Sequence, residues 1–284
     1  MRICAGIVLF NPDVERLKKN IEAIIWQVEK IYIIDNGSRN QHAIRKLVNS
    51  YGTVSLTINS DNLGIAKALN QMCSLAIEDN YQWILTLDQD SICSVGMLDI
   101  MKNYVNNKNI GIICPDIYYE GRKMREKKAK KKIEFVSACM TSASLTNLVA
   151  WKTVGGFCDD YFIDYVDNEF CMKLCLHHYK ILRVNNCILN HQLGQAQQGK
   201  FLGIFKYSYS FHTPIRMYYI TRNNLAFIRT YSKNLNIVKE YIKVIYILTK
   251  NLWVSKQKSV TLKYIFLGIK DYRNKNMGKC KIVY

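Results

Sequence analysis

Proline is scarce in this chain, with 3 residues among 284, and no segment is rich in both proline and glycine. Collagen-like, linker-like and low-complexity architectures are therefore excluded. The chain also lacks an uncharged apolar run of about 18 residues, the length that a spanning helix needs. Its start, Met1-Arg2-Ile3-Cys4, leads into a short apolar stretch with no cleavage-type site. We therefore expect neither a signal peptide nor a membrane-spanning helix.

The ten cysteines include no CxxC pair and follow no regular spacing. Structural zinc sites usually contain such pairs, so the sequence argues against one. Without export, cysteines remain in a reducing compartment. We expect reduced, buried thiols and no disulfide scaffold.

Acidic side chains are nearly absent from the C-terminal end. Residues 200–284 contain 17 basic and two acidic residues, Glu240 and Asp271, and so carry +15 of the total charge of +18. The remaining chain is near neutral, and 49% apolar residues suffice for a core. The basic tail suits a polyanionic partner, either an anionic membrane surface or nucleic acid. No helix-turn-helix, RNP-type aromatic motif or zinc finger is evident, which argues against nucleic acid.

An apolar stripe at helical spacing predicts a helix within this tail. The stripe consists of Leu235, Val238, Ile242, Ile245, Leu248 and Leu252. Such stripes more often face a protein core, although the basic flanks leave anionic lipid as an alternative. A second basic run, residues 122–132, is interpreted as a solvated loop, with a mobile loop near an anionic substrate or membrane as the alternative.

Strand and helix signals alternate through the first half of the chain. Strands are expected at residues 3–10, 31–34, 54–58, 83–87 and 110–114, with helices following near 17–25, 43–48, 65–77 and 97–105. Asn11 and Pro12 resemble an N-cap followed by proline at the first helical position. This alternation predicts an α/β fold, a mostly parallel sheet with helices on both faces.

Polar clusters follow two of these strands, at residues 35–38 and 88–91. Ligands of such sheets bind beyond the carboxyl ends of the strands, where both clusters are expected. Asp88 and Asp90 could share one Mg²⁺ or Mn²⁺ ion together with diphosphate oxygens. The alternative is a turn in which Asp90 or Ser91 caps a following helix.

A second acidic cluster contains Asp164, Asp167 and Glu169 among bulky apolar residues. Three carboxylates there are costly unless some are solvated or paired, and one could act as a general base. Helix N-terminal acids favoured by the helix dipole are the alternative, which explains one of the three but not all.

Three basic side chains complete the set of candidates. His191 follows a strand-like segment and could join an oxygen-rich metal site, although a lone histidine is more often structural. Arg216 or Arg222 could pair with a diphosphate through the fork geometry of guanidinium.

The order of these motifs resembles family 2 glycosyltransferases of GT-A fold, most closely the bacterial rhamnosyltransferase-type branch. The motifs are Asn11-Pro12, Asp35-Asn36-Gly37-Ser38, a segment over 62–70, Asp88-Gln89-Asp90-Ser91, Gly155-Gly156-Phe157, a segment over 162–169 and His191-Gln192-Leu193-Gly194. The resemblance covers about residues 3–229. It implies a GT-A domain over residues 1–229 and a basic helical extension over 230–284 that associates with membranes or packs on the body.

The resemblance also implies roles for individual residues. Asp167, with Asp164 as the alternative, is the general base, and Asp90 holds the cation, with His191 nearby. Asp35 contacts the base, and Asp88 lies at the ribose and metal side. The remaining implied donor ligands are Asn11, Asn62, Lys67 and Arg222. The implied acceptor residues are Thr141, Ser142 and Glu169. Ala143 stands where the family usually has glycine.

The implied reaction is an inverting, metal-dependent transfer from dTDP-L-rhamnose, with UDP-hexoses as the alternative donors. The implied acceptor is a cell-surface polysaccharide or a glycan on a polyprenyl diphosphate carrier, at the cytoplasmic face of the membrane. A nucleotidyltransferase is disfavoured, since Phe10-Asn11-Pro12 replaces the glycine-rich loop expected after its first strand. A non-catalytic basic protein that binds membrane or nucleic acid would leave both acidic clusters unexplained.

Overall fold

The computed structural model describes residues 1–119, 131–191, 196–201, 205–210 and 212–282. The chain divides into two compact units, Met1–Cys158 with Val166–Gln192, and Asp159–Tyr165 with Leu193–Tyr284. The division does not coincide with the boundary expected near residue 229. Helix α7 (Pro214–Thr230) belongs to the second unit because it packs against α9 (Lys258–Arg273).

The first unit is built on a nine-stranded sheet with strand order β3-β2-β1-β4-β8-β6-β9-β5, in which β7 also pairs with β9. The strands are β1 Ile3–Leu9, β2 Ile31–Asp35, β3 Val54–Ile58, β4 Trp83–Asp88, β5 Ile92–Cys93, β6 Ile110–Tyr119, β7 Ile133–Val136, β8 Ser144–Asn147 and β9 Lys180–His191. Strands β3, β2, β1 and β4 are parallel, whereas β8 is antiparallel to both neighbours. The predicted mostly parallel α/β sheet is therefore confirmed.

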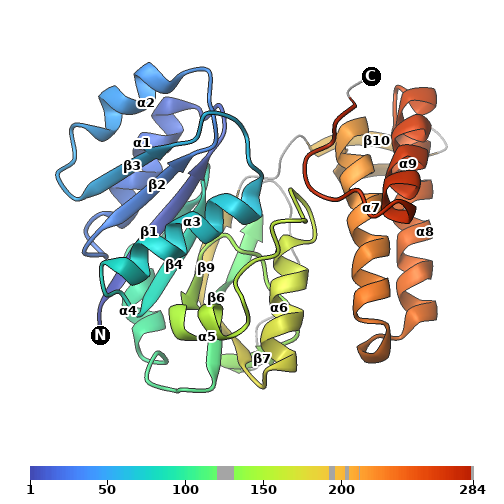
Figure 1. Cartoon of the computed structure of the whole chain (residues 1–284). Helices are drawn as coiled ribbons and strands as arrows, with labels where there is room; N and C mark the ends of the chain where they lie inside the picture. Colours follow the sequence, from blue (N-terminus) through green and yellow to red (C-terminus); the bar gives the residue numbers. More distant parts are fainter. Residues whose placement is uncertain (120–130, 192–195, 202–204, 211, 283–284) are drawn as a thin grey trace. The chain divides into compact units, whose positions relative to one another are not determined.

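Helices cover both faces of this sheet (Figure 1). They are α1 Val14–Ile24, α2 Gln41–Val48, α3 Ile65–Glu78, α4 Met97–Lys102, α5 Leu148–Thr153 and α6 Val166–Leu176. Ala5 and Ile7 of β1 share a core with Leu17 and Ile21 of α1. The alternate residue Gly6 faces α3 so closely that a Cβ there would meet the Met72 sulfur. Two apolar faces explain why β1 is buried along its whole length.

The N-cap predicted at Asn11 is wrong. Helix α1 begins at Val14, and the carboxylate of Asp13 accepts a hydrogen bond from the main-chain N–H of Arg16. Asn11 instead has a φ of +50°, and its carboxamide oxygen accepts from the N–H of Arg39. Asp13 therefore caps the helix, and Asn11 braces the loop after β2.

The second unit contains a hairpin, β10 Ala196–Phe201 with β11 Phe205–Ser210, and three helices, α7, α8 (Ile237–Val254) and α9, which lie side by side (Figure 1). Helices α7 and α9 approach closely at Gly268, where a Cβ would lie 2.7 Å from the carbonyl oxygen of Tyr218. The predicted tail helix is present. Its predicted stripe divides: Val238, Ile242 and Ile245 are 60–69% exposed, whereas Leu248 packs against Met217 and Ile265, and Leu235 precedes the helix.

The ten cysteines are all free, and seven of them are buried. Cys175 is exposed, and Cys139 and Cys158 are partly buried. None of the helices in the described residues combines the length and apolarity that crossing a bilayer requires.

Candidate active site

The two polar clusters lie at one edge of the sheet. Strand β1 pairs with β2 on one side and with β4 on the other, so Leu9 is opposite Asp35 and Val8 is opposite Asp88. The two aspartates therefore end neighbouring strands of β1 at the same carboxyl edge, as predicted from the strand pattern.

Asp35 is fully buried at this edge. Its Oδ1 accepts hydrogen bonds from the main-chain N–H and the hydroxyl of Ser38. Its Oδ2 has no hydrogen-bond partner among the described residues. Burying a carboxylate oxygen without a hydrogen-bond partner lowers the stability of the fold. In native proteins such atoms usually contact a ligand, an ion or a water molecule. Asp35 therefore keeps one carboxylate oxygen that no described residue satisfies.

Asn36 connects the loops that follow β2 and β3. Its amide nitrogen donates to the Oδ1 of Asn62 at 3.2 Å and to the carbonyl of Gly64 at 3.0 Å. Its amide oxygen accepts from Asn59 and from the main-chain N–H of Leu63. The predicted donor residue Asn62 therefore holds the loop in place, and its Oδ1 also accepts from the N–H of Gly64.

Lys67 and Asn11 lie beside this loop network. Lys67 is exposed in the first turn of α3, where unpaired main-chain N–H groups favour anions. Asn11 donates its main-chain N–H to the Ser38 hydroxyl at 2.7 Å. Lys67 is thus available to an anionic ligand, whereas Asn11 supports the structure around Asp35.

The turn over residues 88–90 is clamped by two side chains of α1. The amide of Asn20 donates to the carbonyl oxygen of Asp88 at 2.7 Å, and Nε of Arg16 donates to that of Asp90 at 2.8 Å. Both contacts use main-chain oxygens and not the carboxylates, and both aspartates are half-buried. The helix-capping alternative is wrong, because β5 follows this turn and Gly96 occupies the N-cap of α4. The turn instead presents two carboxylates at the edge.

Ser142 supports the same turn from the other side. Its buried hydroxyl lies 2.6 Å from that of Ser91 and accepts from the N–H of Asp88 at 3.3 Å. The neighbouring Ala143 has a φ of +58°, a conformation that favours glycine. The predicted acceptor residue Ser142 therefore positions Asp88.

Thr141 and Asp167 line one small pocket. Its other lining side chains include Cys139, Met140, Phe157 and Phe170. The carbonyl of Thr141 accepts from the Thr86 hydroxyl at 2.6 Å, which places the pocket beside the end of β4. Asp167 lies in the first turn of α6 and is partly exposed. Asp167 and Thr141 therefore border the same small pocket of the first unit.

Glu169 differs from Asp167 despite sharing that helical turn. It is buried, and its carboxylate forms an ion pair with Lys173 at 3.3 Å. Lys173 also donates to the carbonyl of Gly156. Glu169 therefore anchors α6 to the preceding loop, and this burial argues against the acceptor contact expected from the resemblance.

In the second unit, Asp164 is engaged by Arg216. The guanidinium donates to both carboxylate oxygens, at 2.7 and 3.2 Å, and the Asp164 side chain is 13% exposed. Such a two-point pair restrains the carboxylate and neutralises its charge. Asp164 therefore links its loop to the first turn of α7 through Arg216.

Arg222 corrects the sequence analysis. Its side chain is fully buried and donates to the carbonyl of Gly278 at 2.7 Å, the hydroxyl of Tyr218 at 3.1 Å and the carbonyl of Asp160 at 3.3 Å. A guanidinium enclosed in this way contradicts the expected contact with diphosphate. Arg222 instead ties α7 to the segment that follows α9.

His191 is the last residue of β9, where its main chain is paired with Tyr119, and its side chain lies outside the described part of the structure. Residues 120–130, which contain most of the second basic run, lie outside it as well. Within the described residues, no three His, Cys, Asp or Glu side chains form a group that could hold a metal. Asp88 and Asp90 still fit Mg²⁺ or Mn²⁺, since these ions often bind one or two carboxylates and complete their shell with water and phosphate oxygens.

Asn20 and Asn59 were not predicted, and Asn36 was named only as a member of the polar cluster over residues 35–38. Asn20 occupies a buried position of α1 beside Leu17 and Ile21, where the helical pattern calls for an apolar residue. A polar residue at a core position of the helical pattern could have identified Asn20, because a buried amide needs hydrogen-bond partners.

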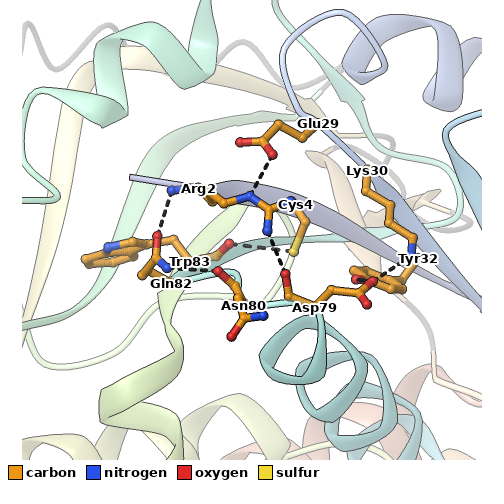
Figure 2. A network of polar contacts seen from close by, with 9 residues as sticks. All are labelled: Arg2, Cys4, Glu29, Lys30, Tyr32, Asp79, Asn80, Gln82 and Trp83. Carbon is orange, nitrogen blue, oxygen red and sulfur yellow. Dashed lines mark hydrogen bonds and ion pairs between the residues drawn. The ribbon is translucent and has the colours of Figure 1, made fainter.

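The opposite, amino-terminal edge of the same strands is also polar (Figure 2). Arg2 forms an ion pair with Glu29 at 2.9 Å, and Lys30 forms one with Asp79 at 2.6 Å. The hydroxyl of Tyr32 also donates to Asp79. The hydrogen bond from Lys30, followed by that from Tyr32, lowers the pKa of the Asp79 carboxyl. The charged groups at this edge are thus paired with one another.

The model of glycosyl transferase family 2 matches residues 4–163, more than half of the chain, including both polar clusters and the pocket residue Thr141. The chain belongs to this family. This membership confirms the expected family 2 glycosyltransferase.

Two kinds of relative agree with this assignment. The glycosyltransferase is 26% identical over 245 residues to the dTDP-rhamnosyl transferase RfbF of Shigella flexneri, covering 80% of each chain. Its fold is similar to a mannosyltransferase of Pyrobaculum calidifontis solved with GDP-Man and Mn²⁺ (TM-score 0.61, 9% identity, 97% and 88% coverage). It is also similar to S. aureus TarS solved with UDP-GlcNAc (TM-score 0.57, 13% identity, 96% and 80% coverage). The expected GT-A fold is thereby confirmed.

Proposed function

We propose that this glycosyltransferase moves L-rhamnose from dTDP-L-rhamnose to a hydroxyl of a cell-surface glycan, with inversion at the anomeric carbon. The observation that carries the proposal is the carboxyl edge of β1, β2 and β4, where Asp35 keeps an unpaired buried oxygen and only β1 lies between its strand and that of Asp88. The similarity to a dTDP-rhamnosyl transferase over 80% of the chain supports this donor.

The donor nucleotide is proposed to lie along that edge. Oδ2 of Asp35 accepts an N–H of the base, and Asp88 lies toward the ribose. Lys67 and the N-terminus of α3 face the diphosphate. Asp90, assisted by His191, would hold Mg²⁺ or Mn²⁺, which when bound supplies positive charge that stabilises the leaving diphosphate. The Asn20 and Arg16 clamp keeps both aspartates in position.

Asp167 is the proposed general base. Its carboxylate takes the proton of the acceptor hydroxyl while the hydroxyl oxygen bonds to the anomeric carbon. The bond from that carbon to the diphosphate oxygen breaks, and the nucleoside diphosphate leaves with the electron pair. Thr141 borders the same pocket and is the proposed acceptor contact.

The acceptor is proposed to be a glycan on a polyprenyl diphosphate carrier at the cytoplasmic membrane face. The +15 balance of residues 200–284 would attract the second unit to anionic lipid, which keeps the enzyme peripheral on that face.

A thermal-shift panel of dTDP, UDP and GDP, each with and without Mn²⁺, tests the donor site. We expect dTDP to raise the Tm most, and only with the ion, because ligands that bind the folded state alone stabilise it by mass action. Release of dTDP from dTDP-L-rhamnose in the presence of lipid-linked glycan tests the reaction. A larger shift with UDP, with turnover of a UDP-hexose, would replace rhamnose by that sugar. No shift with any nucleotide would contradict the proposal.

A further inference from the structure

Helix α8 is apolar on two opposite sides. One side packs in the second unit through Val244, which is buried, and through Leu248, which joins a core with Met217 and Ile265. The other side is exposed to solvent. A helix that is apolar all round is normally covered on every side.

The α8 outer face consists of Val238, Ile242, Ile245, Thr249 and Trp253. At about 100° per residue, these five positions fall within roughly 80° of one another and about opposite to Val244. The four apolar side chains are 60–72% exposed. The hydroxyl of Thr249 donates to the carbonyl of Ile245 within the helix at 2.8 Å. The hydroxyl hydrogen on this face is therefore already bonded and needs no partner outside the helix.

Lysines follow one edge of the α8 outer face. Lys239, Lys243 and Lys250 lie on one flank at helical spacing, and Lys250 lies over the ring of the exposed Tyr246. The acid of this helix, Glu240, is paired with Lys243 at 2.6 Å, so its charge is already neutralised. A positive flank beside an apolar strip is the pattern of helices that lie in the plane of an anionic membrane.

Charge decides between lipid and a second copy of the chain. Two copies packed through this face would bring their lysine flanks together within a surface that already carries a large positive balance. Anionic headgroups provide the opposite charge, and the acyl region accepts isoleucine, valine and tryptophan. Trp253 and Tyr246 have the amphipathic rings that favour the boundary between these regions.

We propose that the α8 outer face inserts into the headgroup region of an anionic bilayer, with its apolar side chains below the phosphates and the three lysines at their level. Hydrophobic insertion therefore adds to the electrostatic attraction of the basic unit. The inference deepens the membrane association proposed above and does not depend on the sugar donor.

Vesicle co-sedimentation of the full chain tests this inference. We compare phosphatidylcholine vesicles with vesicles containing phosphatidylglycerol, at low and high salt. Ile242→Ser combined with Ile245→Ser should weaken partitioning onto anionic vesicles by at least about tenfold, since each buried isoleucine contributes strongly. Lys239→Gln combined with Lys250→Gln should weaken it by about fivefold per lysine, on anionic vesicles alone.

A matched control removes exposed apolar side chains elsewhere. Trp26 and Val95 of the first unit are 92% and 100% exposed, so Trp26→Ser combined with Val95→Ser should bind vesicles as the parent chain does. An unchanged Tm verifies that each variant is folded. Equal binding by the isoleucine variant and the parent would overturn the inference, as would a dimer that this variant converts to monomer. The assay uses no nucleotide, so its failure leaves the transferase proposal intact.

Discussion

The two edges of strands β1, β2 and β4 are both polar, yet their charges are used differently. At the amino edge, Lys30 and Tyr32 contact Asp79, and Arg2 contacts Glu29 (Figure 2). At the carboxyl edge, the fully buried Asp35 retains an oxygen without a partner in the described structure. Pairs as exposed to solvent as these contribute little to stability, because water screens their attraction. A buried unpaired oxygen costs stability, and that cost is expected where a ligand completes the site.

The largest difference in turnover is expected between Asp167→Asn and Asp79→Asn, a substitution at the amino edge. We expect turnover to fall about 10²- to 10⁴-fold through loss of the general base, with dTDP binding unchanged. Turnover assays and nucleotide thermal shifts measure the two effects. Asp79→Asn at the amino edge is the control and should retain turnover. Full activity in Asp167→Asn, with loss in Asp164→Asn, would transfer the base role to Asp164.

Asp90→Asn should remove the Mn²⁺-dependent part of the dTDP thermal shift, because an amide is a weaker ligand for a hard cation than a carboxylate. Asp79→Asn is again the matched control, and it should lower the Tm without changing the nucleotide shift. An unaltered Mn²⁺ titration in Asp90→Asn would remove this residue from the proposed metal site.

The pH dependence of the free energy of unfolding should report the contacts of Asp79 with Lys30 and Tyr32 at the amino edge. Because Lys30 and Tyr32 lower the pKa of Asp79 in the folded state, the carboxylate stabilises the fold above its unfolded pKa of about 3.9. This contribution is lost as the pH falls through the lower, folded pKa. Urea unfolding of the parent chain and Asp79→Asn should therefore differ at neutral pH and converge in acid. A constant difference across this range would contradict the pairing.

The smallest effect is expected from Ala143→Gly beside the turn over residues 88–90. An alanine in the left-handed conformation destabilises the fold by about 1–2 kcal/mol, which glycine would relieve. Glycine also raises the entropy of the unfolded chain, and this cancels part of the gain. We expect a net gain of about 0.5 kcal/mol in urea unfolding. Ala68→Gly within α3 is the opposite control and should lose about 1 kcal/mol. Destabilisation of both variants would show that the backbone at Ala143 is unstrained.

The sheet edge could be predicted from sequence because strand and helix signals alternate, which places the end of each parallel strand at the same side. Asp35 and Asp88 follow from this pattern without any distance information. Arg222 could not be placed in the same way. A guanidinium in an aromatic segment suits either diphosphate or main-chain carbonyls, and only the packing of α7 on α9 decides between them.

Helix α8 shows a second limit of sequence periodicity, which does not reveal what the apolar side of a helix faces. Spacing identified Val238, Ile242 and Ile245 as neighbours on one side of a helix, and this is confirmed. It carried no information on what covers that side, because a core, a second chain and a lipid surface all select the same residue types. Likewise, Asn20 was missed because one polar residue does not alter the helical pattern of α1.

The enclosure of Arg222 has a consequence for the end of the chain. The rings of Tyr218 and Tyr219 lie 5.1 and 5.2 Å from its guanidinium, and the carbonyl of Gly278 accepts a hydrogen bond from it. Main-chain oxygens here solvate a cation in place of water. Trimming the chain before Gly278 would remove the shortest of these hydrogen bonds to the buried cation, so the segment after α9 contributes to the protein interior.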